Sequence, residues 1–253
     1  MPGAEPWSFV PSTPATVGAL TLHGFTGNPS SMRGVAEAFA AAGFHVELPR
    51  LPGHGTVMED MLPTTWADWV GEAEAAYQRL AARCEQVVVA GLSMGGALTL
   101  RLGADHPDIA GLVCINPATQ PQAPEVVAML HEMLGDGMEV MPGIGSDIAD
   151  PDAHETAYEG TPVRALLSLV TDGLAPLGDA YPTMRPPLLL MNSPQDHVVD
   201  PAQAEFLAAH YGGPVERVTL ERSYHVATQD YDKELIFAEA VAFARRVTAG
   251  APA

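Results

Sequence analysis

The chain has 253 residues, of which 47% are hydrophobic and 17% charged, and its formal net charge is −19. Its length is that of one large α/β domain, and its composition is that of a folded protein rather than a disordered chain. Of its twelve basic residues only Lys233 is a lysine, so no basic stripe can neutralise a phosphate backbone. Nucleic acid is therefore excluded as an expected partner, and the scattered acidic residues indicate a solvated surface.

The two cysteines, Cys84 and Cys114, are too few for the disulfide framework of a small secreted protein. The N-terminal residues lack a basic segment followed by an apolar one. No stretch approaches the roughly 18 to 20 apolar residues that span a bilayer. We therefore expect a soluble protein that is not exported and acts in the cytoplasm.

Short apolar runs alternate with amphipathic segments from the start of the chain. Residues 15–22 are predicted to form a strand. The helix after them is expected to have Ser30 or Ser31 as its N-cap and to end at Gly43. Residues 44–48 form the second predicted strand.

A long amphipathic helix is predicted over residues 64–83, with Thr64 or Thr65 as its N-cap. The alternation then repeats. Strands are expected over 86–92 and 111–116, and a helix from Met94 to Ala104 lies between them.

The same alternation resumes after residue 186. Strands are expected over 187–192 and 215–220, followed by helices over 202–211 and 233–247. Continuous apolar strands that alternate with helices predict an α/β fold class, with a mostly parallel sheet covered by helices on both faces. Ligands of such sheets bind beyond the carboxyl ends of the strands.

Residues 117–186 interrupt this alternation. They contain no clear strand, and Met-rich helical segments are mixed with Gly/Pro turns. Long insertions outside the sheet of a compact domain are usually functional. We therefore predict an inserted helical cap, or lid, within a single domain over residues 1–253; the alternative is a helical excursion without a functional role.

A serine between a predicted strand and a predicted helix is the first candidate for chemistry. Ser93 lies between Gly91 and Gly95 in the pattern G-x-S-x-G, with an apolar strand before it and an apolar helix after it. A serine hydroxyl becomes an effective nucleophile when it is exposed, oriented and placed beside a base. Ser93 is therefore predicted to be the nucleophile of a serine hydrolase, in preference to a plain turn residue.

Acyl transfer also needs N–H donors that point at the developing oxyanion. One is expected to be the backbone N–H of Met94, the residue after the nucleophile. The second is expected from Phe25, in the loop HGFTG after the first predicted strand. His23 in the same loop is expected to make structural hydrogen bonds, in preference to acting as the base.

The general base is expected to be a histidine downstream of the acid, if the chain order is Ser, then Asp or Glu, then His. His225 follows the last predicted strand by a short loop and precedes a helix, which places it at the carboxyl edge of the sheet. The remaining histidines outside these loops lack that placement: His45, His54, His106, His131, His154 and His210.

The acid must orient the imidazole of the base and stabilise its charged form. Asp196 lies in the loop after strand 187–192, at the same carboxyl edge. Asp200 is close by, but it precedes Pro201 at a helix start, where an N-cap is the expected role. Asp196 is therefore the predicted acid, and His197 is interpreted as a loop residue that projects in another direction.

No cluster of His, Cys and Glu residues has the spacing of zinc ligands, and no glycine-rich phosphate loop is present. We expect neither a metal nor a cofactor. The expected reaction is the hydrolysis of an ester or thioester through an acyl-enzyme on Ser93.

Several segments, in the same order, resemble the α/β-hydrolase superfamily and, within it, the bacterial carboxylesterase and monoacylglycerol lipase group. They are HGFTGNPSSMR, PRLPGHG, the tryptophans Trp66 and Trp69, AGLSMGG, DHVVDP and SYHVATQDYDKELI, and they cover nearly the whole chain. The resemblance implies a triad of Ser93, Asp196 and His225. It also implies Phe25 and Met94 as oxyanion donors.

The predicted cap is similar to the lid of bacterial monoacylglycerol lipases in GIGSDIADPD and AYEGTPVRALLSLV. In those lipases polar lid groups bind the glycerol end of the substrate, and apolar lid residues hold the acyl chain. The resemblance suggests Glu159 and Asn116 as polar contacts, with surface or turn roles as the alternative. The suggested acyl-chain contacts, which helical spacing also makes typical of a core, are Ile144, Ile148, Leu166 and Leu169.

The leading hypothesis is a cytoplasmic or membrane-peripheral monoacylglycerol lipase that releases a fatty acid and glycerol. One alternative is a carboxylesterase that acts on short-chain esters. Another, from a different class, is a catalytically silent α/β-hydrolase fold that binds a ligand. An apolar, Met-containing cap could contact a membrane transiently or a second copy of the chain in a homodimer.

Overall fold

One seven-stranded sheet is the centre of the computed structural model, which describes residues 1–13 and 15–249. Within the described residues the strand order is β1-β3-β2-β4-β5-β8-β9. All neighbouring strands are parallel except β1 and β3, so the predicted mostly parallel α/β sheet is confirmed. The strands are β1 (Trp7–Phe9), β2 (Val17–Leu22), β3 (His45–Leu48), β4 (Gln86–Leu92), β5 (Gly111–Ile115), β8 (Leu188–Asn192) and β9 (Val215–Thr219).

Strand β1 was not predicted. It pairs antiparallel with β3, with Trp7 opposite Leu48 and Phe9 opposite Val46. Three residues after a proline are too few for an alternation to be recognised in the sequence. The strand is formed because it pairs with the exposed edge of β3.

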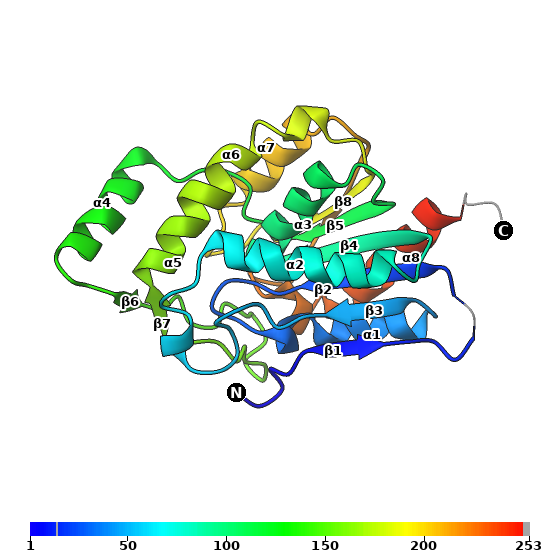
Figure 1. Cartoon of the computed structure of the whole chain (residues 1–253), viewed down its shortest axis with the longest axis horizontal. Helices are drawn as coiled ribbons and strands as arrows, with labels where there is room; N and C mark the ends of the chain where they lie inside the picture. Colours follow the sequence, from blue (N-terminus) through cyan, green and yellow to red (C-terminus); the bar gives the residue numbers. More distant parts are fainter. Residues whose placement is uncertain (14, 250–253) are drawn as a thin grey trace.

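Helices cover both faces of the sheet (Figure 1). Side chains of β4 alternate between the faces: Val87 and Val89 join one apolar core, and Val88 and Ala90 join the other. Since both faces are covered, both sets are apolar, which explains the continuous apolar run. One face carries α1 (Arg33–Ala41) and α8 (Lys233–Thr248), and the other carries α2 (Trp66–Ala81), α3 (Met94–Asp105) and α7 (Ala202–His210).

The helix starts were predicted with mixed success. Thr65 begins α2 as predicted, and the Asp68 carboxylate accepts hydrogen bonds from the Thr65 N–H at 2.8 Å and hydroxyl at 2.7 Å. The expected Ser30 or Ser31 cap before α1 is wrong. The residue at the N-cap of α1 is Met32, which makes no side-chain cap bond. Asn28 instead caps the 3-10 turn Pro29–Met32 that leads into α1: its side chain accepts a hydrogen bond from the Ser30 N–H at 2.9 Å.

Residues 117–186, which we call the cap, lie between β5 and β8. The cap contains a two-stranded antiparallel sheet, so the expectation that it held no strand is wrong. Its strands are three residues each and pair across 17 intervening residues of loop, a contact without a local sequence pattern. The elements are α4 (Pro124–Gly135), β6 (Val140–Pro142), β7 (Gly160–Pro162), α5 (Val163–Ser168), a π-helical stretch Leu169–Leu174, α6 (Ala175–Leu177) and a 3-10 turn Tyr181–Thr183.

Different parts of the cap are in contact with the rest of the chain to different extents. The Ser168 hydroxyl accepts a hydrogen bond from the Trp66 N–H at 3.1 Å, at the start of α2. In contrast, Leu130 is the sole buried residue of α4, and Figure 1 shows this helix at the outer edge of the molecule.

Further 3-10 turns occur at Met58–Asp60 and Ala227–Gln229. No helix in the described part of the chain is both long and apolar enough to cross a membrane.

Candidate active site

Ser93 occupies the turn between β4 and α3, with φ 57 and ψ −117. This left-handed conformation is strained for a residue with a Cβ, and it persists only where the surrounding structure imposes it. The Ser93 N–H donates to the Ile115 carbonyl oxygen at 3.0 Å, and its own carbonyl oxygen accepts from the Ala97 N–H at 3.2 Å. The turn therefore presents the serine side chain beyond the carboxyl ends of the strands.

Two glycines make this turn possible through close contact rather than flexibility. A Cβ on Gly91 would lie 2.0 Å from the Gly95 carbonyl oxygen, and a Cβ on Gly95 would lie 2.1 Å from the Leu22 carbonyl oxygen. Both distances are far below van der Waals contact and involve backbone atoms. The glycines of the G-x-S-x-G pattern are thus required by packing against each other and against the end of β2.

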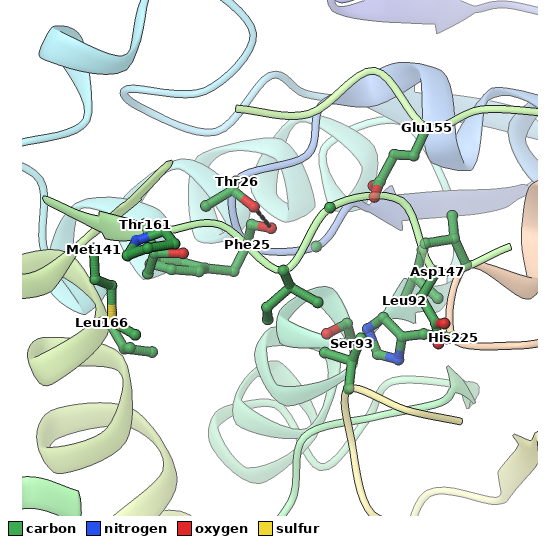
Figure 2. A pocket seen from close by; sticks show the side chains of 16 residues that line it. Phe25, Thr26, Leu92, Ser93, Met141, Asp147, Glu155, Thr161, Leu166 and His225 are labelled. Carbon is green, nitrogen blue, oxygen red and sulfur yellow. Dashed lines mark hydrogen bonds between the residues drawn. The ribbon is translucent and has the colours of Figure 1, made fainter. Parts of the chain in front are cut away.

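The predicted base and acid are in contact. His225 Nδ1 lies 2.8 Å from Asp196 Oδ2, and their side chains are 8% and 2% exposed. The other Asp196 oxygen accepts hydrogen bonds from the Val198 and Val199 N–H groups, each at 2.8 Å. Such bonds stabilise the ionised carboxylate. Figure 2 shows the imidazole of His225 next to the Ser93 hydroxyl, in a cavity that both residues line.

Two alternatives weighed from the sequence have structural roles. The Asp200 carboxylate accepts a hydrogen bond from the Ala202 N–H at 2.9 Å, at the start of α7. His23 Nδ1 donates to the Gly24 carbonyl oxygen at 3.0 Å, and its Nε2 accepts from the Leu51 N–H at 3.1 Å. Both ring nitrogens of His23 are therefore used by the backbone.

The loop of residues 23–27, which contains the predicted oxyanion donor Phe25, lies beside Ser93. A Cβ on Gly24 would be 3.4 Å from the Ser93 Cβ, so the backbone of this loop runs along the serine. The Phe25 ring packs against Trp69 at a centroid distance of 5.6 Å and against His54 at 6.3 Å. Met94 is the first residue of α3, where an N–H has no acceptor within the helix.

The cavity at Ser93 lies between the cap and the carboxyl edge of the sheet. Of the predicted site residues, Ser93, His225, Phe25, Ile144 and Leu166 are in its wall. The remaining wall residues are Gly24, Thr26, Leu92, Met141, Pro142, Gly145, Asp147, Glu155, Thr161, Val198 and Val226.

In the part of the chain that the structure describes, four residues suggested as substrate contacts do not line this cavity. Ile148 packs against the core beneath α1 and α8, and Leu169 is buried in the core on the other face. Glu159 is exposed. Asn116 donates to the Ser193 hydroxyl at 3.0 Å and to the His225 carbonyl oxygen at 2.8 Å, so its amide joins the loops that contain Asp196 and His225 instead of facing the cavity.

Glu155 is a polar wall residue that the sequence did not single out. It comes from the cap and lies close to the loop of residues 23–27, where a Cβ on Gly27 would be 2.8 Å from Glu155 Oε1. Burial raises the pKa of Glu155 to about 7, and the nearby His225 acts in the opposite direction. No repeating pattern marks it, because the cap segment from 143 to 159 has neither helix nor strand. Among the described residues, no group of three His, Cys, Asp or Glu side chains could hold a metal ion.

The chain belongs to the α/β hydrolase family, whose model matches residues 19–239. It is 44% identical over 244 residues to the thermostable monoacylglycerol lipase of Bacillus sp. strain H-257, covering 95% of this chain and 94% of that protein. It is 25% identical over 230 residues to a carboxylesterase of Bacillus subtilis strain 168, covering 90% of this chain and 92% of that one.

The solved structure of a metagenome-derived lipolytic enzyme matches with a TM-score of 0.91 and 43% identity, covering 97% of this chain and 99% of that one. The predicted family and the predicted enzyme class, a carboxylic ester hydrolase, are confirmed by these likenesses. The fold class is confirmed as well.

Replacing Ser93 with Ala and with Gly should separate backbone strain from chemistry. Both variants lack the hydroxyl, but glycine adopts the backbone angles of residue 93 without the penalty that a Cβ brings. We expect Ser93→Gly to be more stable than Ser93→Ala by about 1 kcal/mol in urea denaturation. At Ala97, inside α3, the change to Gly should instead destabilise by about 1 kcal/mol. Equal stability of the two Ser93 variants would show that the turn is unstrained.

Two buried histidines that contact each other, His23 and His54, should make the protein sensitive to acid. Burial lowers the pKa of His23 to about 3 and that of His54 to about 4, whereas an unfolded chain protonates histidine near pH 6.5. Their contribution to stability is therefore complete above about pH 6.5 and is lost as the pH falls towards 4. Each should add about 1.4 kcal/mol per pH unit to the slope of the unfolding free energy in that window.

Urea denaturation between pH 7.5 and pH 5 measures this slope. His54→Phe keeps an aromatic ring in contact with Phe25, Trp69 and His23. Because it removes one group that takes up a proton on unfolding, it should lower the slope by about 1.4 kcal/mol per pH unit. His210→Gln, at an exposed position, should leave it unchanged. If His54→Phe leaves the slope unchanged, the pKa of His54 is not lowered in the folded protein.

Proposed function

We propose that this protein is a serine hydrolase of monoacylglycerols that acts through Ser93, His225 and Asp196. The observation that carries the proposal is the hydrogen bond between His225 and Asp196, at 2.8 Å, together with a serine on a strained turn that lines the same cavity as His225. A nucleophile, a base and a group that orients the base are the parts that acyl transfer requires.

In the proposed reaction the Ser93 Oγ attacks the ester carbonyl carbon while His225 Nε2 takes the hydroxyl proton. Asp196 accepts the Nδ1–H of His225 and stabilises the imidazolium. The Phe25 and Met94 N–H groups stabilise the negative oxygen of the tetrahedral intermediate. The carbon–oxygen bond to the alcohol then breaks, and the alcohol takes the proton from His225. Water repeats the sequence on the acyl-enzyme and releases the fatty acid.

The cavity lining supports a substrate with one acyl chain and one polar end. Met141, Ile144 and Leu166 supply apolar surface from the cap, and Thr26 and Glu155 supply polar groups. Figure 2 places Met141 and Leu166 at one end of the cavity and Ser93 and His225 at the other. The likeness to a monoacylglycerol lipase, at 44% identity, is greater than the likeness to a carboxylesterase, at 25%.

The proposal includes the organisation of the chain. Residues 117–186 act as a cap over the site within a single domain of residues 1–253. The protein is cytoplasmic or membrane-peripheral, and the cap contacts lipid transiently or forms a homodimer. Exposed apolar side chains on the cap support this part: Met129, Met138 and Ile144 are 44%, 46% and 69% exposed.

Comparing turnover of monolauroylglycerol, short-chain butyrate esters and triacylglycerols tests the substrate. We expect the highest kcat/KM for monolauroylglycerol, because its acyl chain covers the apolar cap surface. Ser93→Ala should abolish turnover and leave the fold intact. Negligible turnover of monolauroylglycerol with rapid turnover of butyrate esters would favour a carboxylesterase. If a fluorophosphonate probe did not label Ser93, the protein would be a ligand-binding member of the family.

The acid can be assigned by comparing two aspartates of one loop. Asp196→Asn should reduce kcat by at least about a thousandfold, because the His225 tautomer and its imidazolium lose their carboxylate partner. Asp200→Asn keeps a side-chain oxygen at the start of α7 and should stay within about threefold of the parent rate. A severe loss for Asp200→Asn with a benign Asp196→Asn would reverse the assignment.

A further inference from the structure

A cap carboxylate, Asp147, is bonded to the backbone of the base itself. Asp147 Oδ2 accepts a hydrogen bond from the His225 N–H at 3.0 Å, and the Asp147 carbonyl oxygen accepts one from the Val226 N–H at 3.0 Å. The Asp147 side chain is 14% exposed and lies in the cavity wall. Figure 2 shows it beside His225.

The same carboxylate also holds the loop of the acid. Asp147 Oδ1 pairs with His197 Nδ1 at 2.8 Å, and Oδ2 accepts from the His197 N–H at 3.2 Å. His197 directly follows Asp196, and its ring contacts the Tyr224 ring edge-on at a centroid distance of 4.5 Å. Asp147 thus joins the residue after the acid to the base, so the two loops that carry the pair share one support.

The position of Asp147 is fixed by a second carboxylate. Asp230 is fully buried and accepts hydrogen bonds from the Ala149 and Asp150 N–H groups of the cap at 2.7 and 3.0 Å. It also accepts one from the Tyr224 N–H at 2.9 Å. The cap segment 147–150 is therefore attached to the base loop even without the Asp147 side chain. A change at Asp147 should remove its contacts without releasing the segment.

We propose that Asp147 is a positioning residue of the reaction, which sets the distance and direction of the His225 imidazole relative to Ser93 from the cap. This inference rests on the proposed function of Ser93, His225 and Asp196. Its physical basis is that charge-assisted hydrogen bonds are strong and directional. Misplacement of a catalytic group by about 1 Å can lower a rate by about a hundredfold.

The test compares Asp147→Asn with Asp152→Asn, which removes the charge of an exposed aspartate in the same cap loop. The readouts are steady-state hydrolysis of p-nitrophenyl butyrate and the rate at which a fluorophosphonate labels Ser93. For Asp147→Asn we expect kcat and the labelling rate to fall about ten- to hundredfold, with KM within about threefold of the parent value. Asp152→Asn should match the parent in all three. A kcat for Asp147→Asn within about threefold of that control would overturn the proposal.

A double-mutant cycle separates positioning of the base from a general structural role. In a His225→Ala background there is no imidazole to place, so adding Asp147→Asn should cause no further loss of p-nitrophenyl ester hydrolysis. The same fold-loss in both backgrounds would overturn the proposal. Asp147→Glu keeps the carboxylate and should recover part of the rate at which the probe labels Ser93. If Asp147→Glu is labelled no faster than Asp147→Asn, the proposal that Asp147 positions His225 is contradicted.

Folding and the proposed function are checked in the same samples. Near-UV circular dichroism and the midpoint of thermal unfolding should be similar for Asp147→Asn, Asp147→Glu and Asp152→Asn. If Asp147→Asn does not fold, Asp147→Glu replaces it in the activity measurements and in the double-mutant cycle with His225→Ala, and the same criteria apply. A parent protein that hydrolyses no ester and is not labelled would contradict the proposed function and this inference together. An active parent with an unaffected Asp147→Asn contradicts the inference alone.

Discussion

The close packing of the turn at Ser93 against the ends of two neighbouring strands is the constraint on which the site depends. β4 lies between β2 and β5, and the turn contacts both: Gly95 has no room for a side chain beside the Leu22 carbonyl oxygen, and the Ser93 N–H bonds to Ile115. These contacts hold a residue with a side chain in a left-handed conformation. Phe25, in the loop after β2, lines the same cavity as Ser93.

Most of the sheet and the central pair could be predicted from the sequence, for a physical reason. A parallel strand covered on both faces needs apolar side chains on both sides, so β4, β5 and β8 read as unbroken apolar runs. The carboxyl ends of such strands meet at one edge, which is why the loop positions of Asp196 and His225 were sufficient to bring them together. β1 could not be found in this way, because it depends on pairing with β3 and not on its own pattern.

The cap was predicted as an insertion but not in its details. Periodicity assigns a face to residues of a helix or strand, and the segment from 143 to 159 is neither. Glu155 and Glu159 were therefore indistinguishable in sequence, although one is in the cavity wall and the other is exposed. Asn116 was misplaced for a related reason. Its amide joins Ser193 and the carbonyl oxygen of His225, which come from loops far apart in the chain, and such convergence has no local signal.

The buried Asp230 carboxylate, with N–H donors from the cap and from the base loop, limits how independent the cap is as a unit of protein engineering. A cap transplanted from a relative to alter chain-length preference would replace residues 147–150 but leave Asp230 behind. The graft would then have to present two backbone N–H groups to that carboxylate, since an ionised group buried without its donors is costly. Cap and base loop are therefore best exchanged together, as one cassette.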